Sequence, residues 1–130
     1  MRAVVNLLID IGNTSAKASF ANEVVLEEPV RFEGADVSGF IYDLAIQRRP
    51  HVIAISSVRK FEEGYFSRLE SVCNKLIVVG GDTILPVINR YKTPGTLGSD
   101  RILSAVAAIS LFPGKDIIVF DFGTALTIDF

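Results

Sequence analysis

The chain has 130 residues, 13 basic and 15 acidic, and is 49% hydrophobic, which favours a compact globular core and excludes extended disorder. Without a net positive charge or a run of lysine and arginine, the sequence indicates neither nucleic acid binding nor an anionic membrane as partner. The single cysteine excludes an intrachain disulfide. No apolar run reaches the roughly 18 residues of a membrane span, and residues 1–20 lack a signal-peptide pattern. We therefore expect a cytoplasmic protein.

The first predicted element is a short apolar strand that ends at Asp10, where a carboxylate can hold Mg²⁺ through water. The turn that follows combines Gly12, which lets a backbone approach closely, with Asn13 and Thr14, which add polar groups to the exposed amides. Residues 15–20 alternate like a returning strand. The stretch predicts a phosphate- and metal-binding β-hairpin, although an ordinary hairpin turn accounts equally well for the motif taken alone.

The middle of the chain predicts further strands and two helices. Residues 23–26 read as a third strand, prolonged by 30–32 beyond a proline. Helical spacing then predicts a helix capped by Asp36, followed by a strand over 51–56, a helix whose apolar stripe runs from Tyr65 to Cys73, and a strand over 76–79. The order strand-strand-strand-helix-strand-helix-strand predicts an α/β domain with the ribonuclease-H-like mixed sheet.

Residues 84–99 are rich in proline and glycine and predict a long irregular loop, which is a candidate binding surface. Ser99 is expected to cap a helix over 100–112. Its first turn carries Asp100, whose ionised form the helix N-terminus favours, and Arg101, whose charge opposes the helix dipole. An acidic residue at a helix start is common without any function, but the arginine argues for an external anion such as a phosphoryl group.

A second hairpin of the same design occupies residues 117–129, where Asp121, Gly123 and Thr124 stand as Asp10, Gly12 and their neighbours do 111 positions earlier. The repetition predicts a duplicated fold in which each copy offers one turn to the same phosphates. We therefore expect an N-terminal domain over 1–115 and the opening hairpin of a second domain over 116–130.

The motifs DIGNT at 10–14, GSDR at 98–101 and DFGTALTID at 121–129 together resemble those of type III pantothenate kinases, in the superfamily of acetate and sugar kinases, Hsp70 and actin. The family usually has alanine where this chain has Ser99. The resemblance implies an actin-like ATPase fold and ATP-dependent phosphorylation of pantothenate to 4'-phosphopantothenate, the first step of coenzyme A biosynthesis. It also implies a homodimer that completes the pantothenate pocket.

The resemblance further implies roles for individual residues. Asp100 corresponds to the catalytic carboxylate, Asp10 to the residue that governs Mg²⁺, and Asp121 to the residue near a monovalent cation, K⁺ or NH₄⁺. Pantothenate contacts fall on Tyr91, Gly98, Ser99 and Arg101. Contacts to the ATP phosphates fall on Asp10, Gly12, Asn13, Thr14, Lys17, Gly123 and Thr124.

Other functions stay open at this point. Because the sequence holds only the first hairpin of the second domain, we expect little or no kinase activity from the 130-residue chain alone. One alternative is a non-catalytic nucleotide-binding fragment or an accessory, regulatory protein of the same fold, although the three aspartates favour kinase ancestry. Another alternative is a sugar or carboxylate kinase, against which the GSDR motif argues.

Overall fold

The backbone divides between Val79 and Gly80 into two units, and the computed structural model describes residues 4–80, 83–123 and 125–130. The first unit contains β1 (Asn6–Ile11), β2 (Ala16–Ala21), β3 (Val30–Phe32), α1 (Val37–Arg48), β4 (Val52–Ser57), the 3-10 helix η1 (Ser67–Val72) and β5 (Lys75–Val78). The second contains the 3-10 turn η2 (Pro94–Thr96), α2 (Ser99–Leu111), β6 (Val119–Phe122) and β7 (Leu126–Asp129). The domain boundary expected after residue 115 stays a prediction.

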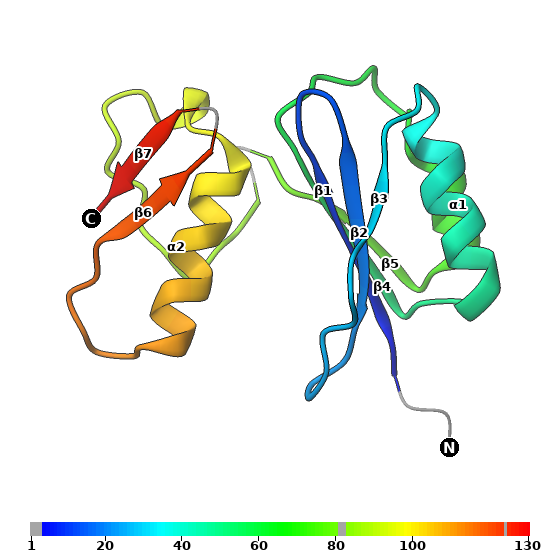
Figure 1. Ribbon diagram of the computed structural model, residues 1–130, viewed down its shortest axis with the longest axis horizontal. Coiled ribbons are helices and arrows are strands. Elements are labelled where there is room, and N and C mark those ends of the chain that lie inside the picture. Colours follow the sequence, from blue (N-terminus) through cyan, green and yellow to red (C-terminus); the bar gives the residue numbers. More distant parts are fainter. Residues whose placement is uncertain (1–3, 81–82, 124) are drawn as a thin grey trace. The chain divides into compact units, whose positions relative to one another are not determined.

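The first unit is built on a mixed sheet in the order β3-β2-β1-β4-β5 (Figure 1). The three N-terminal strands pair antiparallel, β1 with β2 from Asn6↔Ala21 to Ile11↔Ala16. On its other edge β1 pairs parallel with β4, and β4 pairs parallel with β5. The order confirms the predicted ribonuclease-H-like arrangement and makes β1, the strand that carries Asp10, the middle strand of the sheet.

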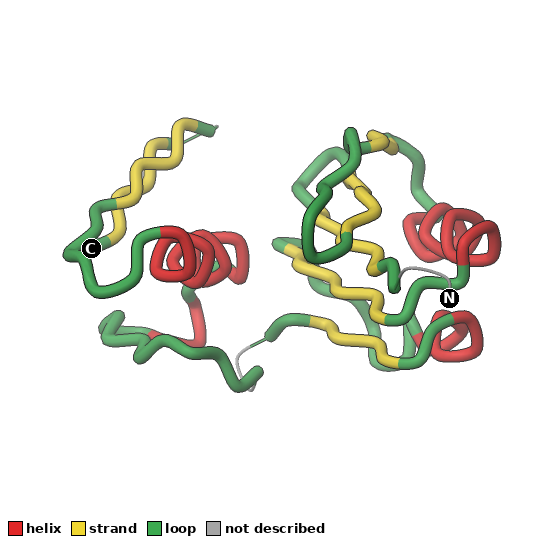
Figure 2. Tube along the Cα trace, turned by 90° about the horizontal axis from the view of Figure 1, so that it is seen from below, coloured by secondary structure: helices red, strands yellow, loops and turns green. Residues whose placement is uncertain are grey.

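One face of this sheet is covered by helices. Figure 2 shows α1 and the η1 turn of the first unit on the same side of the strands. Along β1, Leu7, Ile9 and Ile11 are buried on that side, while Leu8 and Asp10 alternate outward and are exposed. Ile41 of α1 and Leu69 of η1 are fully buried against them. The core therefore fixes one side of β1, and the carboxylate of Asp10 stands on the other side.

The predicted third strand over 23–26 is wrong. In this segment only Leu26 forms a bridge, to Ala21, and Val24 is 90% exposed. The side chain of Asn22 accepts hydrogen bonds from the amides of Val24 and Val25, at 2.9 and 2.8 Å. This local side-chain bonding turns the chain and outweighs the β-propensity of the valines, so the third strand forms later, as β3.

Of the two helices predicted in the first unit, one is an α-helix and the other is a 3-10 helix. The first is confirmed, because Asp36 caps α1 by accepting the amide of Gly39 at 2.8 Å. The second is a 3-10 helix, η1, that begins only after Phe66. Its predicted first turn is taken by an aromatic cluster in which the Tyr65 and Phe66 rings lie 4.5 and 5.0 Å from the Phe61 ring. The segment therefore forms the 3-10 helix Ser67–Val72 where an α-helix was predicted.

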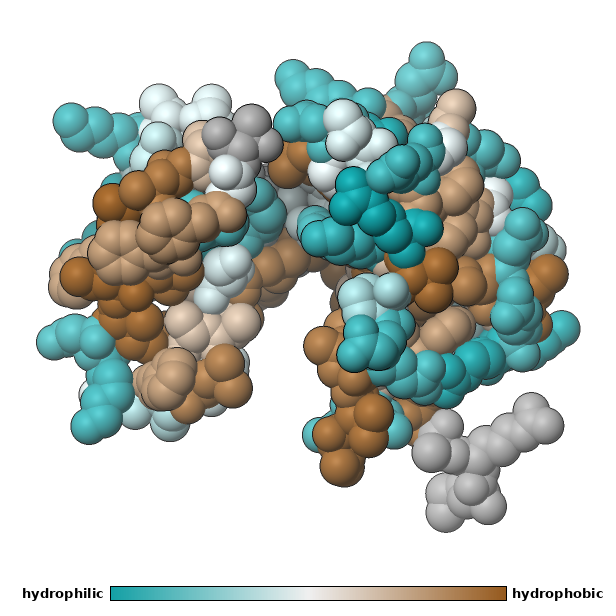
Figure 3. All heavy atoms as spheres, viewed as in Figure 1, coloured by the Kyte–Doolittle hydropathy of each residue, from teal (hydrophilic) through white to brown (hydrophobic). Residues whose placement is uncertain are grey.

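In the second unit, the helix α2 begins one residue earlier than predicted. Ser99 is not its cap but its first helical residue and is buried, while Gly98 occupies the N-cap position without a side chain to bond the helix amides. The antiparallel pair β6-β7 confirms the second predicted hairpin. Figure 3 shows a largely hydrophobic surface over this hairpin, to which the exposed Phe120, Phe122 and Ile128 belong. Within the described ranges, no helix is long and apolar enough to cross a membrane.

Candidate active site

The first predicted phosphate turn is a tight hairpin connection between β1 and β2. The amide of Gly12 donates to the carbonyl of Ser15 at 2.8 Å and closes the turn, whose tip residues Asn13 and Thr14 are exposed. Asp10 lies directly opposite Lys17 in the register, so both exposed side chains belong to the same face of the sheet. The structure therefore brings the predicted residues of this motif together on one hairpin.

The end of β4 is fastened to the same turn. The amide of Val58 donates to the carbonyl of Ile11 at 3.0 Å, and Nε of Arg59 donates to the carbonyl of Gly12 at 2.5 Å. Arg59 lies outside the three predicted motifs. The available signal was its position just after a strand that runs parallel to β1, because ligands of α/β sheets bind at the carboxyl ends of such strands.

The second predicted phosphate turn repeats the design of the first. Asp121 is the penultimate residue of β6, as Asp10 is of β1, and it lies opposite Thr127 in the register. The amide of Gly123 donates to the carbonyl of Ala125 at 3.2 Å, two residues on, whereas the amide of Gly12 bonds to Ser15, three residues on. Thr124, the remaining residue predicted for this turn, lies outside the described residues.

The start of α2 holds the predicted catalytic carboxylate. Oδ1 of Asp100 accepts the amide of Arg101 at 2.9 Å. Gly98 lies so close that a Cβ atom at its position would stand 2.4 Å from the same oxygen. The absence of a side chain at Gly98 therefore gives the Asp100 carboxylate its place at the beginning of the helix.

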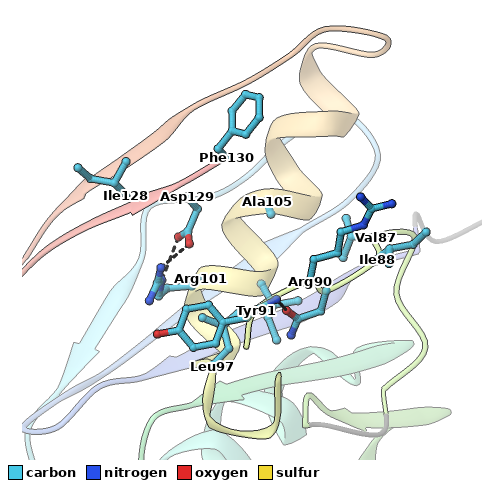
Figure 4. Close-up of a pocket in the computed structure, with 12 residues that line it drawn as sticks. Val87, Ile88, Arg90, Tyr91, Leu97, Arg101, Ala105, Ile128, Asp129 and Phe130 are labelled. Atoms are coloured by element: carbon cyan, nitrogen blue, oxygen red, sulfur yellow. Dashed lines mark hydrogen bonds and ion pairs between the residues drawn. The ribbon is translucent and has the colours of Figure 1, made fainter. Parts of the chain in front are cut away.

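Arg101 is paired with a carboxylate of its own chain. Its Nε donates to Oδ2 of Asp129 at 2.9 Å, and its Nη2 donates to Oδ1 (Figure 4). The hydrogen bonds and the charge of Asp129 raise the pKa of Arg101 further above its ordinary value. The guanidinium carbon also lies 5.6 Å from the centre of the Tyr91 ring. The anion that Arg101 contacts in the structure is Asp129, which was not among the predicted site residues.

Beside this pair lies a cavity of about 380 Å³. Its wall combines the polar groups of Arg101 and Asp129 with apolar side chains, and the residues that matter for its chemistry are Tyr91, Leu97, Arg101, Ile102, Asp129 and Phe130. Figure 4 shows Tyr91 and Arg101 side by side at this cavity. Two of the four predicted substrate contacts, Tyr91 and Arg101, therefore line one hollow, while Gly98 and Ser99 lie at the adjoining helix start.

Within the described residues, no group of three or more histidine, cysteine, aspartate or glutamate side chains comes close enough to hold a metal ion. A Mg²⁺ ion that is bound through one carboxylate, water and phosphate oxygens needs no such cluster. Asp10, an exposed carboxylate beside the predicted phosphate turn, fits that mode of binding.

The motifs also agree with known proteins. A family model described as type III pantothenate kinase matches residues 6–130. A type III pantothenate kinase of Bacteroides fragilis (strain YCH46) is 38% identical over 130 residues, which cover 96% of this chain and 51% of the relative. One of Phocaeicola vulgatus is 39% identical over 126 residues and has the same coverage.

The chain spans about half the length of the curated relatives it matches. Among solved structures, a glucokinase from an Antarctic psychrotroph aligns with a TM-score of 0.43 and 14% identity, over 59% of this chain and 33% of the glucokinase. On the family match over residues 6–130, the chain belongs to the type III pantothenate kinase family.

Proposed function

We propose that the protein containing this chain transfers a phosphoryl group from ATP to pantothenate and forms 4'-phosphopantothenate, the entry step of coenzyme A biosynthesis. The observation that carries the proposal is the match over residues 6–130 to type III pantothenate kinases. The geometry of the three motifs supports it, since two fold as hairpin turns and the third starts a helix.

The phosphates of ATP bind at the two hairpin turns. Gly12, Asn13 and Thr14 offer the backbone and side-chain groups of the first turn, with Lys17 opposite Asp10 as a nearby cation. Gly123 contributes to the second turn, and the motif assigns the same role to Thr124. Mg²⁺, held through water by Asp10, supplies charge neutralisation at the phosphates when it is bound. A monovalent cation, K⁺ or NH₄⁺, binds near Asp121.

Asp100 orients the pantothenate hydroxyl for attack on the γ-phosphate and accepts its proton. Phosphoryl transfer depends mainly on positioning and electrostatic stabilisation, so the carboxylate need not act as a strong base. Tyr91, Gly98, Ser99 and Arg101 hold the pantothenate, with Arg101 presenting to the cavity the guanidinium edge that Asp129 leaves open. We also propose that the complete enzyme is a cytoplasmic homodimer without nucleic acid or membrane partners.

The test uses the family-length protein that carries this sequence and follows 4'-phosphopantothenate by mass spectrometry with ATP and Mg²⁺. Asp100→Asn is expected to lower kcat by at least about a hundredfold at saturating substrates, because loss of the base and of the oriented hydroxyl raises the barrier of the chemical step. Asp116→Asn, which removes an exposed carboxylate from the same unit, is the matched control. Near wild-type turnover in Asp100→Asn refutes the role of Asp100.

A substrate panel decides the function itself. Pantothenate is expected to be phosphorylated in preference to glucose and acetate, which represent the sugar and carboxylate kinases of the superfamily. A wild-type protein that binds ATP but phosphorylates none of the three supports the non-catalytic alternative. The same assay on the 130-residue chain checks the expectation that this part alone has little or no activity.

A further inference from the structure

We propose that Arg59 is a phosphate-binding residue of the nucleotide site, reaching the turn at Gly12 from the end of β4. The inference rests on the proposed function, because it takes the β1-β2 turn to be a binding site for the phosphates of ATP. It adds a cation that comes from outside the three motifs, 47 residues further along the chain.

The position of Arg59 is fixed at both its backbone and its side chain. Oγ of Ser57 accepts the amide of Arg59 and donates to its carbonyl, each at 3.0 Å. The side chain then crosses to the turn, where Nε donates to the carbonyl of Gly12. The arginine is half-buried, so its guanidinium group is held beside the turn and does not extend freely into solvent.

The charge of this guanidinium group is not neutralised within the described part of the chain. The ion pairs there involve Arg31, Arg48 and Arg101, whose carboxylate partners are Glu33, Glu27 and Asp129. Among the residues that the structure describes, the acceptor of the Arg59 side chain is a neutral carbonyl. Glu62, Glu63 and Glu70 line the same hollow as Arg59, but none of them forms an ion pair with it among the described contacts.

A guanidinium group has five N–H donors, and the bond to Gly12 uses one of them. The Nη1 and Nη2 edge stays available, and this is the edge that binds two oxygens of a phosphate at once. The same bond also binds the Gly12 carbonyl, which would otherwise present a partial negative charge to a phosphate. Arg59 thus acts on the turn in two ways. It donates a hydrogen bond to the Gly12 carbonyl oxygen, which would otherwise repel a phosphate, and it adds a positive charge.

Arg59 differs in this respect from Arg101. The guanidinium group of Arg101 already has a carboxylate partner. An anion that binds there therefore meets an ion pair without net charge. The guanidinium group of Arg59 brings a full positive charge to the first turn, where Lys17 is the other cation of the hairpin. A ligand with several negative charges, such as a nucleoside triphosphate, is the class that benefits most from this arrangement.

The experiment compares Arg59→Gln, Arg59→Lys and the control Lys60→Gln in the family-length protein. Lys60 is exposed and adjacent, so its variant removes the same charge one residue away. Affinities for ATP, ADP and adenosine are measured by calorimetry, with inorganic tripolyphosphate as a probe that lacks the nucleoside. Melting temperatures and circular dichroism show whether each variant is folded.

Arg59→Gln is expected to weaken ATP and tripolyphosphate binding about tenfold, the size typical for loss of one hydrogen-bonded charge, with a smaller loss for ADP. Adenosine affinity is expected to stay within about twofold, because adenosine carries no charge for the arginine to bind. Arg59→Lys is expected to retain much of the ATP affinity, and Lys60→Gln all of it.

Two results overturn the inference. One is a folded Arg59→Gln protein that binds ATP as tightly as the wild type, and the other is an equal loss for adenosine and ATP, which indicates a purely structural role. If the wild type phosphorylates pantothenate and Arg59→Gln keeps its ATP affinity, the inference fails and the proposed function stands. If the wild type binds no ATP, both fail.

Discussion

Asp129, the last residue of β7, receives two hydrogen bonds from the guanidinium group of Arg101 in the first turn of α2. Both side chains are mostly buried, with 22% of Arg101 and 26% of Asp129 exposed. The carboxylate offsets the unfavourable position of a cation at a helix N-terminus and fixes the guanidinium plane through two parallel bonds. Asp129 therefore determines which edge of Arg101 the neighbouring cavity receives.

Asp129→Asn is expected to lower kcat/KM for pantothenate about tenfold in the family-length protein, since the amide puts N–H donors against the guanidinium group and releases its orientation. The KM for ATP should not change. Steady-state kinetics with each substrate varied in turn measure both, and Asp116→Asn is the control for removal of an acidic residue from this unit. Equal losses for the two substrates contradict a positioning role for Asp129.

Gly98→Ala is expected to lower kcat strongly with little effect on stability. The backbone of Gly98, with φ −60° and ψ 140°, suits alanine, but the added methyl group meets Oδ1 of Asp100 at 2.4 Å. The flexible carboxylate is expected to move away from the position in which we propose that it acts. Turnover and melting temperature are measured together, and Gly95→Ala, where a Cβ meets no atom within 4 Å, is the matched control. Wild-type turnover in Gly98→Ala contradicts this account.

Asp36→Ala is expected to lower the free energy of unfolding by about 1 kcal/mol, the usual contribution of a side chain that caps a helix N-terminus. The lost bond is the one from the Gly39 amide to Oδ1 of Asp36. Urea denaturation followed by circular dichroism measures the change. Asp36→Asn keeps a cap acceptor and should lose much less; equal losses in the two variants indicate that charge, not capping, stabilises α1.

Cys73 is expected to react slowly with iodoacetamide in the native protein. Burial raises the pKa of this thiol above its ordinary value of 9.0, and the Sγ atom donates to the carbonyl of Leu69 at 3.2 Å. The native state therefore binds the thiol proton more tightly than the unfolded state, and stability falls as the pH rises beyond 9.0.

The measurement is the alkylation rate of Cys73 between pH 7 and 10, followed by mass spectrometry. Native protein should reach its half-maximal rate at a higher pH than the same chain unfolded in urea. Coinciding pH profiles for the native and unfolded chains contradict the raised pKa.

Much of the fold could be predicted because its signals are local. Alternating burial in β1 and the cap at Asp36 follow from neighbouring residues, and both are present. The errors arose where a local contact competed with propensity. The side chain of Asn22 accepts two backbone amides where a strand was predicted. The rings of Phe61, Tyr65 and Phe66 pack together where a helix was predicted to begin.

The candidate site divides in a similar way. The hairpin turns at Gly12 and Gly123 were predicted because each motif is contiguous in sequence and closes on itself. Arg59 and Asp129 were missed because their contacts join residues 47 and 28 positions apart. Such contacts depend on which segments become neighbours in the fold, and the residue spacing within a single motif does not predict this pairing.

The central position of β1 implies a difference in exchange rates within the first phosphate turn. Because β1 is paired along both edges, with β2 and with β4, amides around Asp10 exchange with deuterium only when the sheet opens. Asn13 and Thr14, at the exposed tip of the turn, exchange through small local fluctuations. The carboxylate is thus carried by one of the slowest-opening segments of the unit, and the turn for which we propose phosphate binding begins two residues later.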